Sequence, residues 1–148
     1  MTELYLALCE ALKSAPMDVK HIDRWNQNIE FMEQDSPWAR PAVFVEFGTV
    51  NWEHYGGPVP GETGKGTVIL HLVTDWNGSA AEGSRTQDMA LDDLRFSEEV
   101  EKIVRVLSGR SFRNIRLKVS HPNNNHGDII ETVDEYAVTY ERQFGNDE

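Results

Sequence analysis

The sequence predicts an α+β fold: an antiparallel or mixed β-sheet of about five strands, with two helices packed on one face. Apolar residues recur at helical spacing in two places, near the start of the chain and after residue 90. Several other segments alternate apolar with polar residues, as the strands of a half-buried sheet do. These segments follow one another without regular helical crossovers, which favours an antiparallel or mixed sheet over a purely parallel one.

The length of 148 residues predicts a single domain over residues 1–148, because a chain of this size buries roughly 70% of its unfolded surface around one core. The apolar fraction of 39% supplies that core. No run approaches the roughly 20 apolar residues of a membrane helix, so we expect a soluble protein without a membrane partner. The last residues, Gly145 to Glu148, are expected to form a short flexible acidic tail.

The first helix is predicted between Thr2 and Ser14, with Pro16 beyond its end. Its apolar stripe consists of Leu4, Tyr5, Leu8, Cys9 and Leu12. Charged residues interrupt this segment, so it lacks the unbroken apolar stretch of a secretory signal. Cys9 is the one cysteine of the chain and can form no internal disulfide, which is typical of a protein of the reducing cytosol.

Strand patterns fill the region before the second helix. Val19 to Gln27 alternates weakly. The block from Pro41 to Trp52 alternates clearly, with Phe44 and Glu46 on the opposite face from its valines. Thr67 to Asp75 carries apolar residues on both faces, so we place it in the centre of the sheet.

A second helix and two final strands complete the predicted fold. The helix is indicated by an apolar stripe that ends before Gly109. The members of that stripe are Leu94, Val100, Ile103, Val104 and Leu107. Asn114 to Ser120 and Val133 to Phe144 both alternate, and the polar loop between them, residues 121–128, indicates an antiparallel hairpin.

The segment from Gly48 to Gly66 is dense in glycine and proline, which predicts the end of regular structure and a long loop. Loops of this length are usually functional or disordered. Its end, Gly61 to Thr67, superficially resembles a phosphate-binding loop. The spacing fails, because Val59 replaces the first glycine of that motif and a strand follows where a helix should begin. A turn that enters a strand is the better interpretation.

No catalytic, cofactor-binding or metal-binding residue is predicted, and we expect no enzyme activity and no cofactor. His121, His126 and Asp128 share a loop, but their spacing matches no closed metal site and is typical of a solvated turn. No serine or cysteine nucleophile stands out. Neighbouring acid pairs point to opposite sides of a strand or apart on a helix, so they do not converge on one bond.

The chain is strongly acidic, with 25 acidic and 14 basic residues and a net charge of −11. This charge repels phosphate backbones, which argues against sequence-specific nucleic-acid binding and against anionic membranes. Two interpretations remain open: the charge keeps the protein soluble, or it coats a surface that DNA passes without sticking.

Four side chains are candidates for a protein interface: Trp52, His54, Tyr55 and Trp76. Aromatic residues are enriched at such interfaces, where charged groups are scarce. The alternative is that they pack beneath the long loop and serve the fold.

The order of elements resembles that of the tail terminator, or tail-completion, proteins of long-tailed bacteriophages and prophages. The resemblance rests on the N-terminal helix, the strand around Trp25, the block PAVFVEFGTVNW, the glycine-rich segment, the strand VILHLVTD, the helix through Val104 to Gly109 and the last strand with EYAVTYERQF. It extends from about Leu4 to Phe144. It is a likeness of texture and carries no catalytic signature.

The resemblance implies a small subunit that forms a ring, commonly a hexamer, on the head-proximal end of the tail tube. Such a ring stops tube growth and then docks with the head connector, so the implied partners are further copies of the chain, the tail tube protein and head connector proteins. Assembly would take place in the cytoplasm of a bacterial host, and the product would belong to the virion tail. A related head–tail joining or minor tail protein remains open.

A rival hypothesis is a small-molecule-binding or enzymatic α+β domain with a pocket under the loop 48–66. A deep apolar pocket with converging polar groups and shifted pKa values would favour it. A third interpretation is an adaptor that binds a peptide at a sheet edge.

Overall fold

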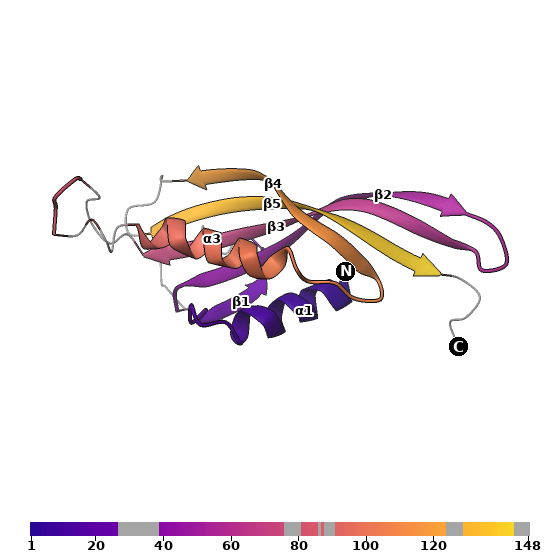
Figure 1. Ribbon diagram of the computed structural model, residues 1–148, viewed down its shortest axis with the longest axis horizontal. Coiled ribbons are helices and arrows are strands. Elements are labelled where there is room, and N and C mark those ends of the chain that lie inside the picture. The colour runs from indigo at the N-terminus through magenta and orange to yellow at the C-terminus, as the bar shows by residue number, and fades with distance from the viewer. Residues whose placement is uncertain (27–38, 76–80, 86, 88–90, 124–128, 144–148) are drawn as a thin grey trace.

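The computed structural model describes residues 1–26, 39–75, 81–85, 87, 91–123 and 129–143. Its elements are α1 (Thr2–Lys13), β1 (His21–Arg24), β2 (Ala42–Tyr55), β3 (Gly61–Asp75), α3 (Asp92–Val104), β4 (Phe112–Asn123) and β5 (Ile129–Gln143). The strands form one sheet of five strands in the order β1-β2-β3-β5-β4. β1 pairs in parallel with β2 and the other pairs are antiparallel. Both helices lie on the same side of this sheet (Figure 1), which confirms the predicted α+β fold.

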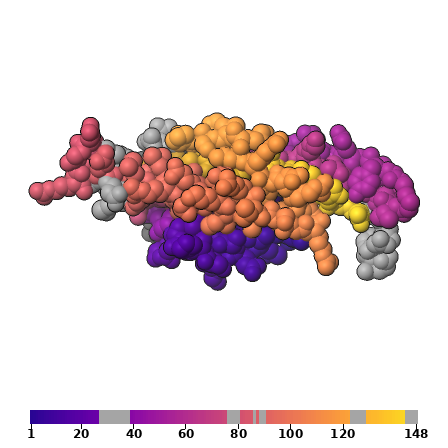
Figure 2. Space-filling model, in the orientation of Figure 1, coloured from indigo at the N-terminus to yellow at the C-terminus, as the bar shows by residue number. Residues whose placement is uncertain are grey.

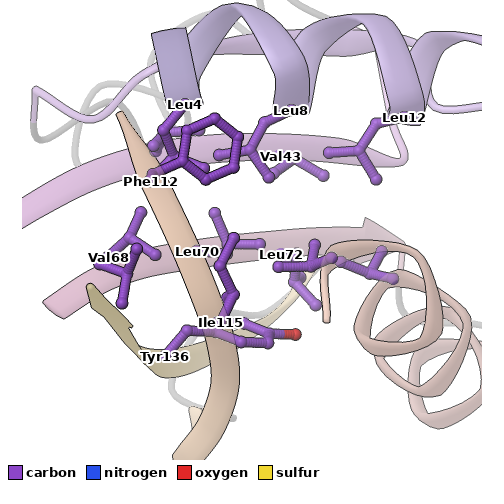
Figure 3. Close-up of a cluster of buried hydrophobic side chains, with 14 of the residues drawn as sticks. Leu4, Leu8, Leu12, Val43, Val68, Leu70, Leu72, Phe112, Ile115 and Tyr136 are labelled. Atoms are coloured by element: carbon purple, nitrogen blue, oxygen red, sulfur yellow. The ribbon is translucent and has the colours of Figure 1, made fainter. Parts of the chain in front are cut away.

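The main core lies between the helices and one face of the sheet, the helix face. α1 points Leu4, Leu8 and Leu12, spaced four residues apart, at the sheet, and all three are fully buried (Figure 3). Alternate residues of the strands pack against these leucines from the sheet. These strand residues include Val43, Val45, Val68, Leu70, Leu72, Phe112, Ile115, Tyr136, Val138 and Tyr140. The predicted central position of β3 is also confirmed, because β2 and β5 flank it on both sides.

α3 packs most of the predicted stripe against the core, because Val100 and Val104 are buried and Ile103 and Leu107 are partly buried against it, but Leu94 is not part of that face. Its buried residues are Phe96, Val100 and Val104, whereas Leu94 is 53% exposed. Ser97 adds a polar contact to this face, since its hydroxyl donates a hydrogen bond to a carboxylate oxygen of Asp134 at 2.7 Å. The assignment of Leu94 to the core was therefore wrong, because Phe96 at the correct helical spacing takes the inward position.

The predicted loop from Gly48 to Gly66 is wrong, because most of this segment is a long antiparallel hairpin. β2 continues to Tyr55, β3 begins at Gly61, and residues 56–60 connect them. Figure 1 shows the hairpin extending beyond both helices. Its glycines are strand residues that make room for large neighbours. A Cβ at Gly64 would lie 2.7 Å from the ring of Trp52, closer than real Cβ atoms approach.

The remaining strands agree more closely with the sequence pattern. The weak strand predicted over Val19 to Gln27 is confirmed in its central part as β1. The predicted pairing of the last two strands is confirmed by the antiparallel register of β4 and β5. β4 runs to Asn123, so His121 belongs to a strand and not to a loop; His126, Asp128 and the tail 145–148 lie outside the described residues.

No helix in the described parts of the chain is long and apolar enough to cross a membrane.

Glu3 connects α1 to the segment between α3 and β4. Its carboxylate accepts hydrogen bonds from the backbone N–H of Ser111 at 2.8 Å, from the Ser111 hydroxyl at 2.7 Å and from the backbone N–H of Arg110 at 3.3 Å. The hydroxyl bond, followed by the backbone bond of Ser111, lowers the pKa of Glu3 from its ordinary value of 4.5.

We expect the contribution of Glu3 to stability to depend on pH. Because its pKa is lower in the folded state, this contribution is complete above about pH 4.5 and is lost as the pH falls through the folded-state value. Glu3→Gln should have a lower melting temperature than the wild type near neutral pH, and the two melting temperatures should converge in acid. The control is Glu10→Gln on the exposed side of the same helix. A melting difference for Glu3→Gln that persists unchanged in acid would contradict the assignment.

Candidate functional site

The structure places the predicted interface residues at the far end of the β2–β3 hairpin, but on both faces of the sheet. Trp52 and His54 pair with Gly64 and Glu62. Both share the helix face with Val50, since alternate residues of a strand point to the same side. Tyr55 lies on the opposite, open face of the sheet. Trp76 lies outside the described residues. The described members therefore do not form one continuous aromatic patch.

Trp52 closes the end of the core beyond the helices. Its ring centre lies 6.2 Å from that of Tyr140, and the guanidinium carbon of Arg142 lies 3.8 Å above the indole. Arg142 also forms an ion pair with Glu62 at 2.7 Å. Trp52 is partly buried against the core cluster. These contacts give Trp52 a packing role in the hairpin.

Tyr55 belongs to a polar cluster on the open face. Its hydroxyl donates to the carboxylate of Glu141 at 3.3 Å, and Thr63 donates to the same carboxylate at 3.3 Å. Arg113 forms an ion pair with Glu141 at 2.7 Å, and its hydrogen bond is the main cause that lowers the pKa of Glu141. Desolvation and the nearby Glu141 charge raise the pKa of Tyr55. The cluster connects β2, β3, β4 and β5 near the far end of the hairpin.

A second polar cluster crosses the middle of the open face. His71 on β3 lies between two carboxylates: its Nε2 is 2.8 Å from Glu46 on β2, and its Nδ1 is 2.8 Å from Glu131 on β5. Trp25 follows β1 and stacks flat on the imidazole, with ring centres 3.7 Å apart and planes 5° apart. The backbone N–H of Trp25 donates to the Val45 carbonyl at 2.9 Å, which fixes the indole over the sheet.

This arrangement explains His71 as a histidine whose hydrogen bonds are satisfied. His71 is 6% exposed and Glu131 is 5% exposed, so the pair is enclosed. Both ring nitrogens are occupied by carboxylates, so the imidazole offers no free nitrogen to a substrate or a metal. Within the described parts of the chain, no group of three or more His, Cys, Asp or Glu is arranged to hold a metal ion. The cluster therefore serves the sheet.

Two sequence signals point toward this cluster in retrospect. Glu46 and His71 are polar residues within otherwise apolar strands, and the alternation places Glu46 on the open face. The sequence does not show which residues of neighbouring strands meet. Glu46 lies two residues along β2 from the partner of His71, and Glu131 lies two residues along β5 from its other partner, so the two carboxylates reach opposite sides of the imidazole. Trp25 is even less predictable, because it reaches His71 through the parallel pairing of β1 with β2.

The loop that the rival hypothesis places over a pocket is a hairpin in the structure, because paired strands occupy most of the segment 48–66. A hollow of about 330 Å³ lies instead at the other end of the sheet, lined by residues that include Thr74, Asp75, Arg95 and Phe96. The groups with clearly shifted pKa values line none of it. They are Glu3, Tyr5, Tyr55, Tyr136, Tyr140 and Glu141.

Comparisons with known proteins identify a shared fold but no matching family. No protein-family model matches the sequence, and the comparison with curated proteins also finds no match. Among solved structures, the chain is similar to a chain of the structure titled "Virion of native gene transfer agent (GTA) particle". The TM-score is 0.51 at 12% sequence identity, and the match covers 94% of this chain and 95% of that one. The two chains share a fold over nearly their whole lengths.

Proposed function

We propose that this protein is a structural subunit of a phage-like particle and acts there as a tail terminator. The observation that carries the proposal is the shared fold with a chain of a gene transfer agent virion, which spans almost all of both chains. In this role, copies of the chain form a ring on the tail tube, stop its growth and join it to the head connector. Assembly takes place in the host cytoplasm, and the ring becomes part of the particle.

The shape of the molecule supports an assembling role. It is elongated, and the β2–β3 hairpin extends from one end (Figure 2). The sheet is open, with β1 and β4 at its two edges. Such edges and projecting hairpins are surfaces on which a second chain can pair. We propose that the hairpin end with Trp52, His54 and Tyr55 contacts the neighbouring subunit, together with Trp76.

The same features argue against the rival function. The loop predicted over its pocket is a hairpin, and Trp52 and Tyr55 hold that hairpin to the last strand instead of lining a cavity. The acidic charge of −11 suits a ring that DNA passes through without sticking. These observations favour a non-enzymatic structural part.

The first test is the mass of the protein in solution by light scattering, over a concentration series at low and moderate salt. We expect a mass near six subunits of 16.9 kDa, with assembly promoted by salt because screening reduces repulsion between acidic subunits. Electron microscopy should show rings that cap tubes of the tail tube protein. A strict monomer under all conditions, with and without the tail tube protein, would contradict the proposal.

A substitution at the hairpin tip tests its place in the interface. Val59 is 41% exposed in the connection between β2 and β3, so Val59→Asp should leave the fold intact and weaken assembly. The matched control is Leu6→Glu, which places a charge on the exposed side of α1, where Leu6 is 61% exposed. Equal assembly of Val59→Asp and the wild type would remove the tip from the interface.

A further inference from the structure

A positively charged groove crosses β3, β5 and β4 on this acidic protein. It has a volume of about 650 Å³. Four cationic side chains line it, Lys65, Arg105, Arg116 and Lys118, and the described residues around it include no carboxylate. All four are exposed. We call this surface the basic groove.

Three of the four cations of the basic groove lack the carboxylate partners that neighbouring cations have. Within the described residues, Lys65, Arg116 and Lys118 form no ion pair, and Arg105 approaches Glu101 only at 3.7 Å. By contrast, Arg113 on the same strand as Arg116 is paired with Glu141 at 2.7 Å. A chain with 25 acidic residues has many possible partners for these cations, yet the fold leaves the groove unneutralised.

The outer side of α3 has the complementary character. Glu98 is exposed and forms no ion pair within the described residues, and Leu94, one turn before it, is 53% exposed. Residues four apart on a helix lie on the same side. Figure 2 shows α3 uncovered along the face turned to the viewer. An exposed leucine beside an unpaired carboxylate is a suitable contact for a cationic groove that also has an apolar lining residue, here Ala137.

We infer that the basic groove is a docking surface for the outer side of α3 of a second copy of this chain. Glu98 of one copy pairs with Arg116 and Lys118 of the next, and Leu94 packs against Ala137. The inference rests on the proposed ring function and names its subunit contact. Because the groove and the α3 surface are different patches, the contact is head-to-tail, as the contacts between neighbouring subunits of a cyclic ring are.

A charge-swap experiment on the full chain tests this contact. Arg116→Glu combined with Lys118→Glu places like charges opposite Glu98, so the apparent dissociation constant of assembly should rise about tenfold or more. Glu98→Lys alone should weaken assembly in the same way. A mixture of the two variants should assemble better than either variant alone, since each mixed contact of altered groove with altered helix restores opposite charges. Circular dichroism and melting curves confirm that each variant is folded.

Matched controls carry the same charge changes elsewhere. Lys13→Glu and Glu10→Lys alter exposed residues of α1, away from the groove, and should not produce the loss or the rescue. If the wild type forms rings and the groove variants do so equally well, the groove contact is wrong while the ring function stands. A wild type that never assembles would overturn both. Binding of short duplex DNA that disappears in the groove variant would replace the second copy by nucleic acid as the occupant.

Discussion

Replacing Tyr136 with alanine is expected to cost about 3–5 kcal/mol of unfolding free energy, as large-to-small changes of buried aromatic residues do. Tyr136, on β5, is one of the two largest fully buried side chains among the described residues, and it lies in the main core between the sheet and the helices. Alanine would leave a cavity there that the surrounding side chains fill only in part. Urea denaturation of the purified variant measures this change in unfolding free energy. A thermal melt of the same variant should show a melting temperature lower by about 10 °C.

Tyr136→Phe is the matched control, because it keeps the ring and removes only the hydroxyl. That oxygen is buried and has no hydrogen-bond partner in the described structure. Burial, with the charges of Asp134 and Glu101, raises the pKa of Tyr136, so the hydroxyl stays neutral. Removing an unsatisfied buried hydroxyl should change stability by less than about 1 kcal/mol or increase it. A large loss in Tyr136→Phe would show that the hydroxyl makes a contact that we have not identified.

The second large effect is expected at His71. His71→Leu removes the imidazole that faces two carboxylates and leaves the enclosed Glu131 charge without it, which should cost about 3–5 kcal/mol. Glu46→Gln should cost less, since 41% of the Glu46 side chain is exposed and water compensates for the lost charge. Chemical denaturation followed by tryptophan fluorescence measures both, because Trp25 stacks on His71.

The double variant His71→Leu with Glu131→Leu separates charge from packing. If the cost comes from an uncompensated buried carboxylate, removing that carboxylate should recover part of the loss, so the double variant should be more stable than His71→Leu alone. Losses that simply add would contradict the electrostatic explanation and leave only a packing effect. Comparing the single and double variants thus shows whether His71 and Glu131 stabilise the fold through their electrostatic interaction.

The sequence predicted the main elements because burial leaves a periodic pattern in the chain. The stripe of Leu4, Leu8 and Leu12 identifies α1, and the two-residue alternation identifies β2, β4 and β5. The hairpin was missed because its glycines were read as turn formers. Gly64 is in fact a strand residue whose missing side chain leaves space for Trp52 on the opposite strand, and no local pattern reveals that pairing.

At the candidate site, too, the sequence indicated residues but not their contacts. The sequence selected Trp52 and Tyr55, and the structure assigns them contacts with Arg142 and Glu141 from the last strand, about ninety residues later in the chain. Their separation of three residues in one strand already predicts opposite faces, whereas the bulge between Phe47 and Val50, which brings Trp52 to the helix face, leaves no local signal.

By itself, then, the sequence predicted an acidic α+β fold with two amphipathic helices and an alternating sheet, because these properties follow from local periodicity and composition. Only the tertiary structure decided which polar residues meet: the imidazole of His71 between Glu46 and Glu131, the indole above it, and the groove of unpaired cations. Strand order and register bring these groups together from distant parts of the chain. The energy of such contacts depends on distance and burial, which local spacing does not encode.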